Sequence, residues 1–141
     1  MGNRYFCNIL HRQAMAEHNE LGSWGESYAR EYLEKSGYIV LEHDWRSARG
    51  GYDVDIICKT PDCRTMVFVE VKTRATNQIV SPEDAVDRRK IRFLGRVADE
   101  YVKTHNVVEE LRFDIIAIVG RKGSAAVQIN HIEDAFNPLL L

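Results

Sequence analysis

Residues 53–74 read DVDIICKTPDCRTMVFVEVKTR, and this stretch decides the fold. Two runs rich in β-branched and aromatic residues, DVDIICK and TMVFVEVKTR, flank a short segment that contains Pro61 and Asp62. This composition predicts a β-hairpin with a short loop. The second run nevertheless carries Glu70 and Lys72 in its middle. Because ionised side chains are costly to bury unless they are paired or bound, these charges belong either to an ion-pair network or to a chemical site.

The register of this hairpin follows from its loop. If residues 61–64 form the loop, the two residue numbers in every facing pair add up to the same total. Asp55 then faces Glu70. By the same rule Asp53 faces Lys72, and side-chain alternation places all of these groups on one side of the hairpin. Facing residues have Cβ atoms about 4.5–5.5 Å apart, so the carboxylates of Asp55 and Glu70 could share one cation.

Two interpretations of these charges stay open. In the first, the facing carboxylates of Asp55 and Glu70 bind a hard ion such as Mg²⁺ or Mn²⁺, which oxygen ligands select when His and Cys are absent. In the second, Lys72 neutralises Asp53 and Glu70 in a cross-strand ion-pair network on a solvated face. A shift of the register by one residue would send Asp55 and Glu70 to opposite faces and would remove the metal site.

Two helices are predicted beside these strands. Residues 21–35 place apolar side chains at helical spacing, and Gly37 follows as a helix terminator. Glu26 falls at the border of the apolar stripe, where it either faces the edge of the sheet or is an ordinary solvated glutamate. Ser81, followed by a proline and two acids, predicts the N-cap of a second helix that ends at about residue 103.

Further strand-like runs complete the order of elements. YIVLEHDW precedes the hairpin, whereas RFDIIAIVG and AVQINHI follow the second helix. The order α-β-β-β-α-β-β predicts an α/β fold with a mixed central sheet flanked by helices. Residues 1–15 show no clear period and are predicted to be a disordered extension, which leaves a single domain over residues 16–141.

Composition narrows the class of protein. The chain has 141 residues, of which 45% are hydrophobic, and its net charge is −2, so a polyanion would have to bind at a local patch. The number of cysteines, three, is odd, and they lack CxxC spacing, which argues against a disulfide framework and a structural zinc site. No apolar run is long enough for a signal peptide or a membrane span. We therefore expect a cytoplasmic protein without a membrane partner.

Basic residues gather near the predicted acidic site. Arg46, Arg49 and Arg74 flank the charged strands and would attract phosphate. Lys90 falls on the core-facing side of the second helix, where it either reaches the acidic cluster or extends its ammonium group to solvent. The arginines of that helix form an outward arc, which is either a solvated face or a patch that follows a phosphate backbone.

Three other residues are interpreted as structural. Trp45 lies at the end of the first strand-like run. Asp114 follows Arg112 by two positions, which predicts a local ion pair. His131 is a lone histidine, and such a residue is more often a satisfied polar group than a metal ligand.

The combined motifs resemble a known group of enzymes. Glu26 on a helix, Asp55 on one strand and the run Glu70-Val71-Lys72 on the next resemble the PD-(D/E)xK nuclease superfamily, whose core has the order α-β-β-β-α-β. More narrowly, HNELGSWGESYAREYLEKSGY, DVDII, VFVEVKTR, AVDRRK, RFDIIAI and INHIEDAF resemble the YraN-like family of predicted bacterial endonucleases. That family is similar to archaeal Holliday-junction resolvases. The resemblance covers nearly all of the chain from about Met15 onward.

The resemblance implies a restriction-endonuclease-like core and a Mg²⁺- or Mn²⁺-dependent phosphodiesterase that acts on DNA, including branched or repair intermediates. Asp55, Glu70 and the backbone carbonyl of Val71 would ligate the metal. Lys72 would orient a water molecule or stabilise charge on the phosphorus. Glu26 would support the metal through water or position the site from its helix.

Other positions take secondary roles under the same resemblance. Arg46, Arg49, Arg74 and Lys90 would contact the substrate, whereas Asp53 is a second-tier site residue because the family usually has Glu there. Residues before Met15 precede the usual start of the family, so Met15 is a candidate initiator beside Met1. The likeness to resolvases implies a homodimer. The alternative is a non-catalytic module that binds nucleic acid or protein and retains the nuclease fold.

Overall fold

The computed structural model describes residues 3–51, 53–76 and 86–140. The elements are α1 (Asn3–Lys35), β1 (Ile39–Arg46), β2 (Asp53–Lys59), β3 (Thr65–Arg74), α2 (Arg88–His105), β4 (Glu110–Val119), β5 (Gln128–Ile132) and the short 3-10 helix η2 (Pro138–Leu140). This order confirms the predicted α/β class and the predicted succession α-β-β-β-α-β.

The strands form one mixed sheet of five strands in the order β1-β2-β3-β4-β5. Only β3 and β4 are parallel, and the other neighbouring strands are antiparallel. A parallel pair needs a connection that returns along the sheet, and α2 lies within that connection. The predicted mixed sheet is therefore confirmed, with its parallel pair at the strand that carries the charged motif.

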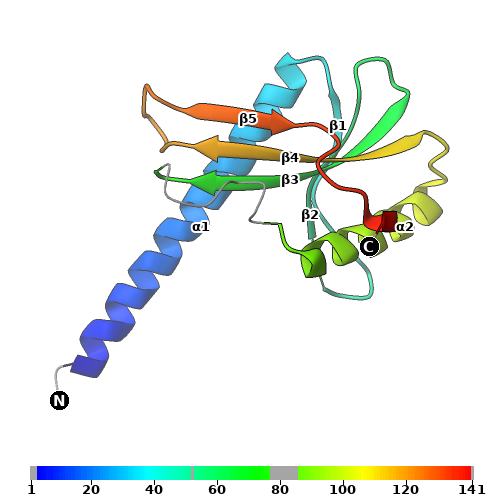
Figure 1. Cartoon of the computed structure of the whole chain (residues 1–141). Helices are drawn as coiled ribbons and strands as arrows, with labels where there is room; N and C mark the ends of the chain where they lie inside the picture. Colours follow the sequence, from blue (N-terminus) through cyan, green and yellow to red (C-terminus); the bar gives the residue numbers. More distant parts are fainter. Residues whose placement is uncertain (1–2, 52, 77–85, 141) are drawn as a thin grey trace.

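The two long helices cover opposite faces of this sheet (Figure 1). On one face, Leu33 of α1 packs with Ile56 of β2 and Val69 of β3 in one apolar cluster. On the other face, Leu94 of α2 packs with Phe68 of β3 in a second cluster. Because each face has its own core, the central strands are buried on both sides, as expected for a sheet between two helical layers.

Helix α1 is longer than the predicted helix over residues 21–35. It begins at Asn3, so residues 3–15 are helical, which differs from the disorder predicted for that segment. Residues 3–20 contain no proline or glycine and many strong helix formers, which explains the extension. Residues 9–20 are all exposed, and Figure 1 shows this half of α1 projecting beyond the sheet. Although α1 has 33 residues, no helix in the described ranges is apolar enough to cross a membrane.

Helix α2 starts later than predicted. The structure places its N-cap at Asp87, whose side chain accepts a hydrogen bond from Lys90 N at 2.8 Å. The N-cap predicted at Ser81 lies outside the described residues. At the other end, Asn106 adopts a left-handed conformation with φ 51°, and its N–H bonds to Val102 O. Asp87 therefore fixes the first turn of α2, from which the Lys90 side chain projects.

The β2–β3 hairpin has the predicted register. Ile56 pairs with Val69, and Cys58 pairs with Val67, which keeps the predicted constant sum. Among the described residues, Ile56 and Val69 form the last pair of this ladder. Beyond it, Asp55 Oδ2 accepts a hydrogen bond from Val71 N at 2.8 Å. A carboxylate thus takes the place of a backbone acceptor where β2 and β3 separate.

Candidate metal centre

Three carboxylates meet where β2 leaves β3. Glu26 of α1, Asp44 of β1 and Asp55 of β2 each offer one oxygen, and these oxygens all lie within 4.8 Å of one another. A hollow of about 160 Å³ is lined by these acids together with Ser23, Ser27, Arg30, His43 and Ile56. This cluster could hold a metal ion. Because its side-chain ligands are all carboxylates, it suits a hard cation better than a soft one.

Irregular backbone places Asp44 and Asp55 in this cluster. β1 contains an irregularity between Val40 and Glu42, and Asp44 has a left-handed φ of 50°. On β2, Val54 belongs to the core under α2, whereas Ile56 belongs to the core under α1. Regular alternation would send both to the same face, so it is interrupted at Asp55. The prediction that alternation keeps all the charges on one side is therefore too simple.

Close packing of α1 places Glu26. The preceding residue, Gly25, lies against Thr73 of β3, and a Cβ atom at position 25 would collide with the Thr73 side chain. A larger residue would force the helix and the strand apart. The glycine therefore allows the carboxylate of the next residue to lie beside Asp44 and Asp55.

The ionised forms of Glu26 and Asp55 are disfavoured in the metal-free chain. Burial, and then the charge of Asp55, raise the pKa of Glu26 to about 8. Burial, and then the charge of Glu70, raise the pKa of Asp55 to about 7, although the Val71 N–H and nearby lysines oppose the rise. A divalent cation between these groups would favour their ionised forms.

Glu70 lies beside this cluster on the face covered by α2. It is only 3% exposed, and its Oε1 lies 3.3 Å from Lys72 Nζ and 3.5 Å from Lys90 Nζ. Its other oxygen, Oε2, is buried and has no hydrogen-bond partner among the described residues. Buried carboxylate oxygens are normally satisfied, so this oxygen fits a ligand of a bound cation. Asp55 links Glu70 electrostatically to Glu26.

Of the predicted basic residues, Lys90 contacts an acid of the site, whereas Arg46 lies at the surface. The Lys90–Glu70 contact confirms the prediction that Lys90 reaches the acids of the charged strands, of which it contacts Glu70. Arg46 instead pairs with Asp53 at 3.4 Å, and the Arg46 side chain is 78% exposed. The structure therefore pairs Asp53 with Arg46 rather than with the predicted Lys72.

The remaining predicted substrate residues lie at the ends of the strands. Arg49 is exposed in the loop between β1 and β2. Arg74 is the last residue of β3, two positions beyond Lys72, and its carbonyl accepts a hydrogen bond from Gly120 N at 2.9 Å. Val71 is placed by its N–H bond to Asp55, and its predicted role as a carbonyl ligand stays a prediction.

Asp44 is the site residue that sequence reasoning missed. In the structure His43 pairs with Ile56 and Trp45 pairs with Val54, so Asp44 lies opposite Asp55. The available signal was that YIVLEHDW precedes DVDIICK and could pair with it antiparallel. The irregularity after Val40 changes the register by one residue, however, and nothing in the residue types announces it.

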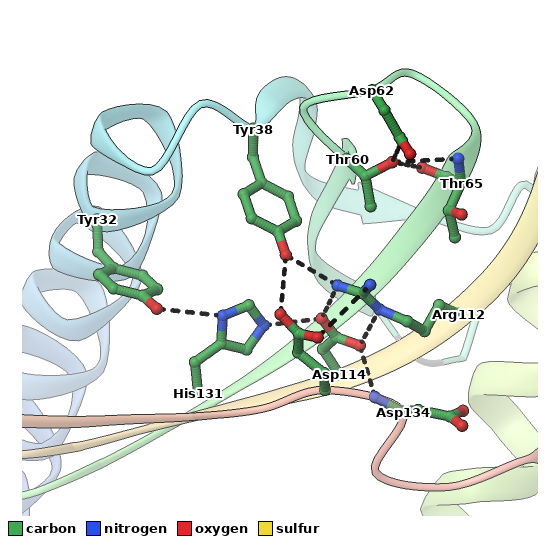
Figure 2. A network of polar contacts seen from close by, with 10 residues as sticks. Tyr32, Tyr38, Thr60, Asp62, Thr65, Arg112, Asp114, His131 and Asp134 are labelled. Carbon is green, nitrogen blue, oxygen red and sulfur yellow. Dashed lines mark hydrogen bonds and ion pairs between the residues drawn. The ribbon is translucent and has the colours of Figure 1, made fainter.

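A different carboxylate, Asp114 of β4, is fully buried and takes part in the network of polar contacts in Figure 2. It accepts hydrogen bonds from Arg112 Nε and Nη2, both at 2.9 Å, and from Asp134 N at 3.0 Å. His131 Nε2 lies 2.7 Å from Asp114, and His131 Nδ1 lies 3.3 Å from the Tyr32 hydroxyl. Burial alone would raise the pKa of Asp114, but these partners outweigh it and lower the pKa.

This network confirms the structural interpretation of three residues. The predicted Arg112–Asp114 ion pair is present, and it extends through His131 to α1. Trp45 likewise packs in the core, with its ring centroid 5.2 Å from that of Tyr101 in an edge-to-face arrangement. None of these side chains lines the hollow at the acidic cluster.

Comparison with known proteins places this arrangement in a family. The model of the family described as "Uncharacterised protein family UPF0102" matches residues 25–118. A UPF0102 protein of Bacteroides thetaiotaomicron is 43% identical over 126 residues, which cover 89% of this chain and 99% of that protein. A UPF0102 protein of Parabacteroides distasonis is 45% identical over 122 residues, covering 86% and 96%. UPF0102 protein FP2501 of Flavobacterium psychrophilum is 42% identical over 122 residues, covering 86% and 98%. The matched range includes the whole acidic cluster together with Glu70, Lys72 and Lys90, and the chain belongs to the uncharacterised protein family UPF0102.

Proposed function

We propose that this protein is a metal-dependent endonuclease that hydrolyses phosphodiester bonds in DNA. The observation that carries the proposal is the state of Glu70. One of its oxygens lies near two lysine ammonium groups, and the other is buried without a hydrogen-bond donor among the described residues. A purely structural buried carboxylate would be satisfied at both oxygens, as Asp114 is.

The sequence resemblance supports the same function. The helix with Glu26, the strand with Asp55 and the strand with Glu70-Val71-Lys72 follow one another in the order seen in the PD-(D/E)xK superfamily and the YraN-like family. The contacts of these residues fit that resemblance, because Asp55 and Glu70 influence each other electrostatically at the point where their strands separate.

The proposed metal ligands are Asp55, Glu70 and the backbone carbonyl of Val71. Glu26 and Asp44 add carboxylates on the other side of Asp55. These residues fit Mg²⁺ or Mn²⁺ because they offer oxygen atoms only, and because the pKa values of Asp55 and Glu26 are raised in the chain alone. When bound, the ion would supply Lewis-acid polarisation of the scissile phosphate.

The lysines beside Glu70 have proposed roles in the same reaction. Lys72 would orient the attacking water or stabilise the negative charge that develops on the phosphate oxygens. Lys90 reaches the site from α2 and would contact the phosphate, as would Arg74 from the end of β3. Arg46 and Arg49 would bind the DNA backbone farther along the loop.

The proposal is tested by cleavage of labelled branched, flapped and single-stranded DNA with Mg²⁺ or Mn²⁺. Glu70→Gln and Lys72→Ala are each expected to lower the rate by about a hundredfold or more, because electrostatic stabilisation at such sites is worth several kcal/mol. Glu109→Gln is the matched control. It makes the same chemical change in a glutamate that pairs with Lys59 at the far end of β2. Full activity in Glu70→Gln would contradict the site.

One observation favours the non-catalytic alternative. Lys72 and Lys90 already neutralise Glu70 within the chain, as in an internal ion-pair network. A binding module would bind DNA without cleaving it under any divalent metal, and Glu70→Gln would then leave its affinity unchanged. Formation of a homodimer and a cytoplasmic location stay predictions. Light scattering of the purified protein tests the first.

A further inference from the structure

A second hollow lies beside the loop between β1 and β2. It is a groove of about 660 Å³ between loop residues 47–50 and α2, and Arg49, Phe93, Arg96 and Val97 are among the residues that line it. Its size falls within the range of about 300–1,000 Å³ that is typical of clefts for small ligands. The acidic cluster lines a separate hollow and does not account for this groove.

The loop wall of the groove is fixed to α2. Glu100 accepts a hydrogen bond from Ala48 N at 3.0 Å and another from the Ser47 hydroxyl. The other acid that lines the groove, Asp99, pairs with Lys103 at 2.8 Å. Both acids are therefore engaged within the chain. The charge of Asp99 is paired with Lys103, whereas Glu100 is held by neutral donors and its charge lies near Arg49.

Two guanidinium groups give the groove a positive character. Arg49 and Arg96 both line it, and the charge of Arg49 acts on Glu100 of the same groove. The guanidinium of Arg96 lies 5.5 Å from the centre of the Phe93 ring, and that of Arg89 lies 5.7 Å from it. Aromatic rings combined with arginines are the usual composition of sites for single-stranded nucleic acid.

The groove adjoins a smaller hollow along the loop between β1 and β2. A neighbouring hollow of about 310 Å³ is lined by Arg46, Ser47, Gly50, Gly51 and Asp53, and it shares Ser47 and Gly50 with the groove. Asp53 begins the strand that carries Asp55 two positions later. On α2, Lys90 precedes Phe93 by about one helical turn, and its ammonium group lies 3.5 Å from Glu70 Oε1. A chain of nucleotides could therefore run along α2 from the groove toward Glu70.

We propose that this groove binds an unpaired nucleotide of the DNA substrate, with its phosphate on Arg49 and Arg96 and its base against Phe93. A base inside a duplex cannot enter, because its neighbours cover its faces and its partner occupies its edge. The protein therefore selects DNA that has a single-stranded segment beside the bond to be cut. The assignment of that bond rests on the proposed nuclease function, whereas binding in the groove does not require cleavage.

The test is equilibrium binding by fluorescence anisotropy with a chelator present, so that no cleavage occurs. The probes are labelled oligothymidine, a duplex of equal length and the same duplex with a single-stranded flap. Phe93→Leu and Arg96→Gln are each expected to weaken binding of the first and third probes about tenfold, and that of the duplex less than about twofold. The matched control, Arg88→Gln, removes a charge from the same helix outside the groove and should weaken binding of all probes alike.

The outcomes separate this inference from the nuclease proposal. Equal affinity of the unsubstituted protein for single strand and duplex, or equal losses on every probe in Phe93→Leu and Arg96→Gln, would overturn the groove. If thermal unfolding shows that Phe93→Leu is misfolded, Arg49→Gln on the loop replaces it. Selective binding without hydrolysis under any metal would sustain the groove and refute the nuclease. Hydrolysis without a preference for unpaired DNA would support the nuclease and refute the groove.

Discussion

Glu70 and Asp114 are buried carboxylates on neighbouring parallel strands, but they differ in how far hydrogen bonds satisfy their oxygens. They lie one step apart in the β3–β4 ladder, where Val69 pairs with Asp114 and Glu70 pairs with Ile115. Asp114 is fully buried and satisfied at both oxygens, whereas Glu70 is 3% exposed and keeps one oxygen without a donor among the described residues. Burial alone therefore does not distinguish a structural acid from a candidate ligand, whereas an unsatisfied buried oxygen marks a candidate.

The cause of the difference is the number of segments that reach each acid. Arg112 precedes Asp114 on the same strand, His131 comes from β5, and the backbone of Asp134 follows β5. Glu70 lies instead where β2 has already separated from β3, and its ion-pair partners among the described residues are Lys72 of the same strand and Lys90 of α2. The first acid joins segments of the fold, and the second is left able to accept a cation.

The largest stability effect is expected at the enclosed acid. Asp114→Asn should lower the free energy of unfolding by about 3–5 kcal/mol, because it leaves Arg112 partly buried without its counter-charge. Denaturant unfolding measures the change. The control is Glu133→Gln, which affects an exposed glutamate 3.8 Å from the same arginine and should cost less than about 1 kcal/mol. A loss in Asp114→Asn as small as in the control would refute the structural role.

A substitution at the open site should have the opposite sign. The pKa of Asp55 is raised from 3.8 to about 7 in the folded state. An ionised Asp55 therefore destabilises the folded state relative to the unfolded state. Asp55→Asn should therefore stabilise the metal-free protein by about 1–2 kcal/mol near pH 8, and the gain should disappear below about pH 4, where both states are protonated. We expect Mn²⁺ to raise the melting temperature of the unsubstituted protein and not that of this variant. A destabilised Asp55→Asn protein would show that the acid is structural.

The pH dependence of unfolding sharpens the contrast further. Because the pKa of Asp114 is lowered in the folded state, its contribution is present above the unfolded value of 3.8 and is lost as the pH falls through the lower folded value. The melting temperature of the unsubstituted protein should therefore drop steeply below about pH 4, whereas that of Asp114→Asn should change less in that window. Parallel curves for the two proteins would mean that other acids govern acid unfolding.

The smallest effect is expected at the edge of the Asp114 network. Tyr32→Phe removes the hydroxyl that lies 3.3 Å from His131 Nδ1 and should cost about 0.5–1 kcal/mol. Tyr28→Phe, one turn earlier on α1, is the control, since no hydrogen bond joins its hydroxyl to another described residue. Denaturant unfolding of both variants measures the difference. A loss of unfolding free energy in Tyr32→Phe as large as in Asp114→Asn would show that the Tyr32 hydroxyl is as important for stability as the Asp114 carboxylate.

The features predicted correctly from the sequence depend on neighbours in the chain. The register of β2 and β3 follows from a short loop and from strand composition, so Ile56 pairs with Val69 as expected. The position of Lys90 follows from helical periodicity. Both are local properties that the order of residues determines directly.

The features that were missed depend on distant or irregular structure. Asp44 enters the acidic cluster through an irregularity in β1 and a left-handed φ, neither of which its residue type requires. The Asp114 network joins Tyr32 to His131, which is 99 positions away, so a local ion pair was all that the sequence could indicate. For α1, the missing apolar period before residue 21 suggested disorder, but helix propensity alone continues the helix to Asn3.

At position 25, the residue that would stabilise the helix is not the residue that suits the acidic cluster. A glycine inside a helix costs about 1 kcal/mol relative to alanine, so the isolated segment would be a better helix with Ala at this position. In the folded chain that single methyl group would collide with Thr73, and relief of the collision would carry Glu26 away from its acidic neighbours. Protein design that optimises α1 by helix propensity would therefore disturb the candidate metal site even if it left the rest of the fold intact.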